Sequence, residues 1–510
     1  MKALTSTNKL FIVAIILVYF FLIAFSVIIR SEPYLNFDEA GQFWMAKGLN
    51  HDSQPLAPTG SLSDVVENNQ DYNFDPGGFS IILHFWSTIS NNYLWLRTLP
   101  FIFFLLAIVS LTCIAYDWTK NKWIAIITGM SFFIFPIMYE EAFNLRAYSM
   151  EILGVLACII IVRGLEKSIT ARRLLISALI ISFFMTSRYS FTILAFTVST
   201  YILYLIFKTS ASYKWKFLNL TLYAVPLFIV LTYNYFFALR FQNPELTSLF
   251  YIPYLKDNPL TLFRGDSLLF IFSIVLIVWY IFLSRRTQTA KKHFGLFYIT
   301  IATSIIFFIL SCLGIYPWLG GQGTTRCITI VTLSIVSVLA ISLDITSSKL
   351  LSYDMNRYLL LFLICVLFVN NNESAVKSYF HNNTASQYKL ISRHDGKVYV
   401  DSNEAPCMRY QFEFGILKDD PTYPLRFTFE YGGKHRLGGK APVNSDKLNA
   451  SQVDLSEYNV LIAPPHKLNN YKIHEEGDKW QLADDNERDW DLTDGKGYVW
   501  IKTSTPTINK

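Results

Sequence analysis

The chain has 510 residues, of which 52% are hydrophobic and only 16% are charged. In a soluble protein about a quarter of all residues are charged, so this composition excludes an ordinary soluble domain and indicates apolar surface facing lipid. The net charge of +6 is modest, and the basic residues fall in short segments between apolar runs. That distribution argues against nucleic acid as a partner, because no single basic face is formed.

Apolar runs of membrane-spanning length, about 17 to 25 residues, recur up to residue 370 and then stop. The first run is too long for a cleaved signal peptide and lacks a small-residue cleavage site, which favours an uncleaved signal anchor. Residues 77–91 are amphipathic and too short to cross, so we expect a helix lying in the interface. The sequence predicts a polytopic α-helical membrane protein with about eleven transmembrane helices, near residues 10–29, 94–116, 123–139, 148–164, 174–187, 190–207, 217–238, 267–284, 294–315, 326–343 and 358–370.

Lysine and arginine collect in alternate loops, and the positive-inside rule assigns these loops to the cytoplasm. The first outer loop, residues 30–93 with the interfacial helix, is acidic before residue 77. We therefore expect an integral protein of a bacterial inner membrane, with a cytoplasmic N-terminus and with Asp38 and Glu39 outside. The residues assigned to the inner side are Lys2, Lys9, Lys120, Lys122, Lys167, Arg172, Arg173, Lys208, Lys214, Lys216, Arg285, Arg286, Lys291, Lys292, Lys349 and Arg357.

From residue 371 the chain becomes polar, with short β-like stretches such as 397–400 and 458–463. We expect two domains: a transmembrane domain over 1–370 and a small α/β domain over 371–510. An odd number of spans places this second domain outside the cytoplasm. The six cysteines form neither a disulfide framework nor the spacing of a zinc site.

Four groups of polar residues fall on the outer side of the predicted membrane domain. Each has a structural explanation: an acid pair can be solvated surface, Asp-Pro-Gly-Gly can be a turn, and arginines at span ends can anchor headgroups. Their coincidence on one face favours chemistry on an anionic lipid-linked substrate, since arginine binds phosphate and a carboxylate can deprotonate a hydroxyl. The groups are Asp38-Glu39, the turn at 75–78, the segment 139–148, and the span-end arginines Arg188, Arg240, Arg264 and Arg326.

Three of these features together resemble the C-type (GT-C) glycosyltransferases. They are the acid pair Asp38-Glu39 after the first span, the interfacial helix after a Pro-containing turn, and Arg146-x-Tyr148 at the start of a span. The branch with the closest resemblance contains the protein O-mannosyltransferases and the aminoarabinose–lipid A transferases, and the resemblance covers residues 1–345. Two positions depart from it. Asn144 stands where the family often has Glu, for which Glu141 can substitute, and the turn reads Asp-Pro-Gly instead of His-Pro-Pro.

The resemblance implies a polyprenyl-phosphate-linked sugar as donor, a glycan, lipid or protein acceptor, and an inverting transfer outside the cytoplasm. In that scheme Asp38 is the general base and Glu39 orients it or the acceptor. The resemblance implies no cofactor and no metal, although a divalent cation between Asp38 and Glu140 or Glu141 stays open. The residues expected to bind the lipid phosphate or the sugar are Arg146, Tyr148, Arg326, Arg188, Tyr189, Asp75 and Glu141.

Two other functions compete with this interpretation. Polysaccharide polymerases and ligases also have many spans and outer arginines, but their key residues usually lie in a large late loop, whereas the long polar segments here are the first loop and the tail. A transporter or lipid flippase would have charged or broken sites near mid-membrane and an internal repeat. No such repeat is visible in this sequence.

Overall fold

The computed structural model of the chain forms two compact units. The first comprises Met1–Ile28, Asp75–Phe79 and Pro100–Glu373, and the second comprises Ile29–Phe74, Ser80–Leu99 and Ser374–Lys510. The structure describes residues 6–29, 35–49, 59–72, 75–241, 254–284, 292–320, 322–346, 354–372, 397–401, 405–415, 418, 427–429, 458–463, 479–482 and 498–503.

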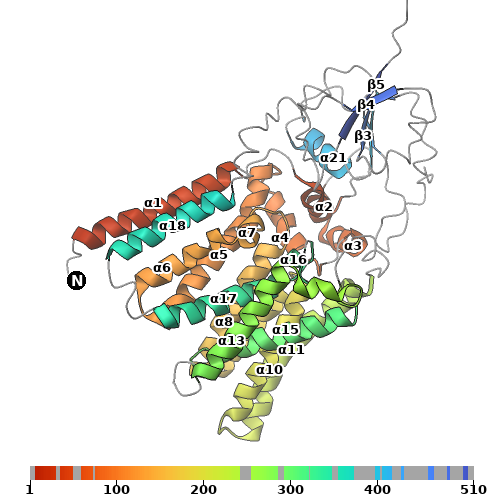
Figure 1. The fold of residues 1–510 in the computed structure, drawn as a ribbon. Coiled ribbons are helices and arrows are strands. Elements are labelled where there is room, and N and C mark those ends of the chain that lie inside the picture. The colour runs from red at the N-terminus through yellow and green to blue at the C-terminus, as the bar shows by residue number, and fades with distance from the viewer. Residues whose placement is uncertain are drawn as a thin grey trace, which may run out of the picture. The chain divides into compact units, whose positions relative to one another are not determined.

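Each predicted span overlaps one or more helices of the structure, which Figure 1 draws. Among the described residues, seven helices are long and apolar enough to cross a membrane, and the predicted count of eleven stays a prediction. The seven are α1 (Ser6–Ile29), α5 (Tyr93–Thr119), α8 (Tyr148–Lys167), α10 (Tyr189–Lys208), α11 (Tyr213–Phe237), α13 (Gly265–Ser284) and α15 (Phe294–Cys312). Shorter helices are α4 (Gly78–Ser87), α9 (Ala171–Met185), α16 (Gln322–Arg326), α17 (Ile328–Thr346) and α18 (Asp354–Asn371).

The predicted span 123–139 is not one continuous helix. It is divided into α6 (Lys122–Met130), the 3-10 turn η1 (Ser131–Ile134) and α7 (Pro136–Glu140). Proline has no backbone N–H to donate, and it disfavours helical torsions in the residue before it. Phe135 accordingly adopts extended torsions, with φ −86° and ψ 107°. The hydrophobic pattern located this segment correctly but missed the break that Pro136 imposes.

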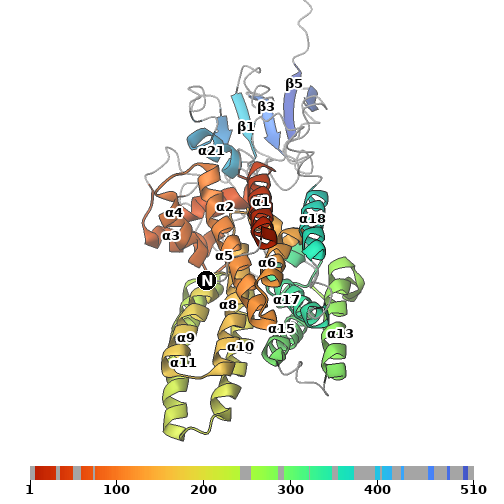
Figure 2. The same cartoon turned by 90° about the vertical axis from the view of Figure 1, so that its left-hand side faces the viewer.

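Helix α8 lies at the centre of the first unit, where it packs against α9, α10 and α17 (Figure 2). Helix α9 packs against α11, α10 against α15, and α13 against α17. The predicted inner-side residues Lys120 and Lys167 both contact the carboxylate of Asp117 at 2.8 Å, at the C-terminal ends of α5 and α8. These charges therefore gather at one end of the bundle, about 24 Å along α8 from the residues of its first turn.

The first and last helices of this unit, α1 and α18, run in the same direction (Figure 1). The ring of Phe11 contacts that of Tyr358 at 5.1 Å, and further along both helices Phe25 contacts Phe368 at 5.6 Å. Two membrane helices that run parallel must end on the same face. This geometry fits the odd number of crossings that the sequence predicts.

The second unit contains the helices between residues 30 and 74 and the C-terminal sheet. Its sheet has the strand order β2-β1-β3-β5-β4, in which β1 pairs in parallel with β2 and β3, while β5 pairs antiparallel with β3 and β4. The strands predicted at 397–400 and 458–463 are confirmed. The elements are α2 (Phe37–Ala46), α3 (Leu62–Tyr72), α21 (Ala405–Glu413), β1 (Lys397–Val400), β2 (Phe427–Phe429), β3 (Tyr458–Ala463), β4 (Lys479–Leu482) and β5 (Tyr498–Thr503).

Reporter fusions test the orientation. We expect alkaline phosphatase, which is active only outside the cytoplasm, to be active when fused after Asn372 and inactive when fused after Thr346, because α17 and α18 cross in opposite directions. Fluorescent-protein fusions at the same two positions should give the reverse pattern. Activity of the phosphatase at Thr346, or at neither position, would contradict the predicted topology.

Candidate functional site

The acid pair Asp38-Glu39 lies in the first turn of α2, a helix that the sequence analysis did not predict. Asn36 caps this helix: its side chain accepts a hydrogen bond from the Glu39 amide at 2.8 Å, and the Glu39 carboxylate accepts one from the Asn36 amide at 3.1 Å. This reciprocal pair is a capping box, whose Asn-x-x-Glu signature was readable in the sequence. The positive end of the helix dipole favours both carboxylates there. Asp38 is half-buried, whereas Glu39 is buried.

Glu39 forms a buried ion pair with Arg97 in the first turns of α5. Arg97 donates from Nε to Oε1 at 3.0 Å and from Nη2 to Oε2 at 2.6 Å, which is the bidentate geometry of a strong arginine–carboxylate pair. Glu39 therefore fixes the start of α2 to α5, and its neighbour Asp38 is fixed with it. The sequence analysis missed Arg97, although a basic residue at the outer end of a span was the signal that drew attention to the other arginines.

The Asp75-Pro76-Gly77-Gly78 turn lies directly against the loop between α9 and α10. Gly77 has φ +93°, which favours glycine, and the Gly78 amide donates to the Thr186 carbonyl at 2.9 Å. A Cβ on Gly78 would lie only 2.0 Å from Thr186 Oγ1. The two glycines thus permit close contact with residues just before Arg188, and this contact brings Asp75 to that arginine.

Arg188 is the centre of the polar site in the first unit, with only 4% of its surface exposed. Its Nε lies 3.2 Å from Asp75 Oδ1 and 3.7 Å from Glu151 Oε2, and its Nη1 donates to the Thr325 carbonyl at 3.2 Å. Its guanidinium carbon lies 4.2 Å from the centre of the Tyr148 ring, a cation–π contact. Burial opposes the charged form of Arg188, but the nearby negative charges, that of Asp75 first, prevail and raise its pKa well above the usual value.

Glu151, in the first turn of α8, is the residue of this site that the sequence analysis missed. It is fully buried and accepts hydrogen bonds from Ser190 Oγ in α10, at 2.5 Å, and from Thr329 Oγ1 in α17. Its carboxylate therefore joins three helices and faces Arg188. A lone acid inside an apolar run was the available signal, because buried carboxylates in membrane helices are rare unless they are paired or functional.

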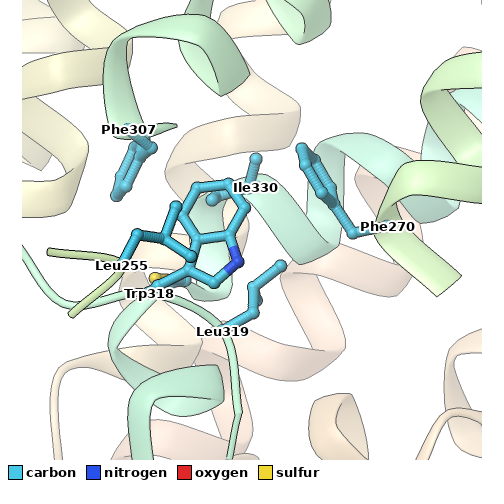
Figure 3. Packing of buried hydrophobic residues seen from close by; sticks show 7 residues of the cluster. Leu255, Phe270, Phe307, Trp318, Leu319 and Ile330 are labelled. Atoms are coloured by element: carbon cyan, nitrogen blue, oxygen red, sulfur yellow. The ribbon is translucent and has the colours of Figure 1, made fainter. Parts of the chain in front are cut away.

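Tyr316 packs against a hydrophobic cluster and lies within electrostatic range of Arg188. Its hydroxyl donates to the Arg326 carbonyl at 3.0 Å, and burial raises the pKa of its phenol, an effect that the positive charge of Arg188 partly offsets. Figure 3 shows the cluster against which Tyr316 packs; the fully buried Trp318 is one of its members. The members are Leu255, Phe270, Phe307, Trp318, Leu319, Cys327 and Ile330.

The other predicted site residues in this unit lie as follows. Glu141 ends α7 and accepts a hydrogen bond from Asn144 Nδ2 at 3.3 Å. Arg146 is half-buried just before α8. Tyr189 follows Arg188 as the first residue of α10. Arg326 is half-buried at the end of α16. No cluster of three or more potential metal ligands occurs within the described ranges.

The chemistry available in each unit follows from these contacts. In the first unit, a buried guanidinium is held in a fixed orientation by two carboxylates, a backbone carbonyl and a tyrosine ring. Arg188 Nη2 makes no hydrogen bond to any residue within the described part of the chain, so its two protons are available for a ligand. In the second unit, Asp38 is a half-buried carboxylate at a helix start that the Glu39–Arg97 ion pair fixes.

Comparison with known proteins shows a full-length structural similarity. No family model matches the chain, and no curated protein matches its sequence. Among solved structures, the chain is similar to ArnT from Cupriavidus metallidurans, in a crystal structure bound to undecaprenyl phosphate, with a TM-score of 0.53 and 12% identity over 99% of each chain. The similarity predicted from the sequence, to the aminoarabinose–lipid A transferase branch, is thereby confirmed as a similarity of fold.

Substitution of Gly78 tests the close contact that brings Asp75 to Arg188. Gly78→Ala should destabilise the protein by about 1–3 kcal/mol, because the added methyl overlaps Thr186. Gly164→Ala is the matched control, since a Cβ there meets nothing within 4 Å; it should be neutral or stabilise by up to about 1 kcal/mol. Thermal unfolding in detergent measures both, and equal melting temperatures for the two variants would contradict the packing described.

Proposed function

We propose that this protein is a membrane glycosyltransferase that moves a sugar from a polyprenyl-phosphate donor to a hydroxyl acceptor outside the cytoplasm. The observation that carries the proposal is the match, over 99% of both chains, to a transferase that was crystallised with undecaprenyl phosphate. The buried Arg188 centre supports it independently, because a fixed guanidinium in a membrane protein suits a lipid phosphate.

In the proposed reaction Arg188 binds the donor phosphate through Nη2. The guanidinium is already oriented by Asp75, Thr325 and the Tyr148 ring, so little reorganisation is needed when the phosphate takes up charge. Glu151, in α8, holds Arg188 in place and does not itself contact the substrate. Further contacts to the phosphate or sugar are assigned to Arg146, Tyr189 and Arg326, and to Glu141 near the same loop.

Asp38 is the proposed general base. It takes the proton of the acceptor hydroxyl while the acceptor oxygen forms a bond to the anomeric carbon from the face opposite the phosphate. The bond between that carbon and the phosphate oxygen breaks, and its electron pair stays on the phosphate. A single displacement of this kind inverts the anomeric centre, and a phosphate leaving group needs no second acid. Glu39, bound to Arg97, acts by holding Asp38 in place.

The role of Asp38 is tested by substitution in cells that lack the native gene. Asp38→Asn should lower formation of the glycosylated product by about 10²–10⁴-fold, the usual contribution of a general base, while binding of undecaprenyl phosphate is unchanged. Glu67→Gln is the matched control, an exposed acid of the same loop within α3. Mass spectrometry of the product measures both variants. Near-normal product from Asp38→Asn would eliminate it as the base.

The phosphate contact is tested by Arg188→Lys, which keeps the charge but removes the fork of donors. Loss of a charge-assisted hydrogen bond of about 1.5–3 kcal/mol should raise the Kd for undecaprenyl phosphate about tenfold to hundredfold. Arg240→Lys is the control, because Arg240 is exposed and, among the described residues, contacts the rings of Phe236 and Phe241. Thermophoresis in detergent measures the Kd, and equal affinity in both variants would refute the assignment.

A further inference from the structure

The helix α2 that carries Asp38 is held at both of its ends, and its second anchor comes from the C-terminal segment. Phe43 and Trp44, near the end of α2, are buried. The Phe43 ring packs edge-to-face on Tyr410 at 5.1 Å and on Phe414 at 5.4 Å. Trp44 Nε1 donates to the Pro406 carbonyl at 3.1 Å. All three partners belong to α21 or to the residues that directly follow it.

Helix α21 is the crossover between the parallel strands β1 and β2 of the C-terminal sheet. Residues 406–411 of this helix are buried at every position. A helix that is buried all round must be covered on more than one side, and α2 covers one of them. Helix α21 thus follows β1 in the chain and packs against α2.

Tyr410 extends this contact toward the other end of α2. Its hydroxyl donates to the Asn91 carbonyl at 2.7 Å, in the segment that leads into α5. Burial raises the pKa of Tyr410, and the charges of Arg97 and Glu39 act on it in opposite directions. One residue of α21 thus lies close to the ion pair that fixes the start of α2.

We propose that α21 is a positioning element for catalysis, which holds the helix of Asp38 through the Phe43–Trp44 contact, so that the C-terminal domain is required for turnover rather than for donor binding. This inference rests on the proposed function, because it takes Asp38 as the base. A small displacement of a reacting group lowers rate strongly even when the change lies far from the chemistry, by about 10²-fold for 1 Å. The affinity for the donor should not depend on the position of α2, because the proposed contacts to the phosphate are made by Arg188 and its neighbours.

The test removes one hydrogen bond and makes one buried aromatic side chain smaller. Trp44→Phe loses the bond to Pro406 and should lower the rate of product formation about tenfold or more, with the Kd for undecaprenyl phosphate within about twofold of the native value. Trp500→Phe is the matched control, because Trp500 Nε1 also donates to a backbone carbonyl in the same segment, that of Ala463 at 3.3 Å. It should leave the rate unchanged. Equal rates in the two variants would overturn the inference.

A double variant separates positioning from mere destabilisation. In the Asp38→Asn background, Trp44→Phe should have no further effect on the residual rate, because there is no base left to misplace. An additive loss would overturn the positioning role. If Trp44→Phe does not fold, Tyr410→Phe, which loses only the bond to Asn91, takes its place with the same expected outcomes. Failure of the proposed function is distinguishable, since full activity of Asp38→Asn alone would refute the base and not the contact.

Discussion

A buried guanidinium is the constraint on which the architecture of the first unit depends. Arg188 is almost completely removed from solvent, and a charge in that position is tolerated only with opposite charges and hydrogen-bond acceptors around it. The chain meets this requirement from three distant segments: the turn at Asp75, the first turn of α8 at Glu151, and the carbonyl of Thr325. Loss of one partner of a buried pair costs about 3–5 kcal/mol, so this centre fixes where the segments meet.

The second unit uses the same principle at α2. Its buried pair of Glu39 with Arg97 fixes the start of a short helix, and aromatic rings from α21 fix its end. A ten-residue helix is only marginally stable by itself in water, so these two anchors determine its orientation. In both units an acid that sequence analysis regards as catalytic or substrate-binding has a structural partner: Asp75 contacts Arg188, and Glu39 contacts Arg97.

Sequence alone predicted the helices well because each is an apolar run bounded by charge, and it predicted strands β1 and β3 as short β-like stretches separated by turn signals. It missed the break before Pro136 and the helix α2. The first was hidden because hydrophobicity continues across the break, and the second because its capping box was not recognised. The pairing of Asp75 with Arg188 was not predictable, since 113 residues separate them. Glu151 was overlooked although it is the only acid within the predicted span 148–164. The roles of the predicted site residues stay predictions.

The central claim is that the protein consumes a polyprenyl-phosphate-linked sugar. Its most direct test is mass spectrometry of the lipid-linked sugars and the cell-envelope glycans in cells with and without the protein. The account predicts that, without it, one polyprenyl-phosphate sugar accumulates while one glycan, lipid or protein loses the mass of that same sugar. Unchanged pools of both donor and product would contradict it.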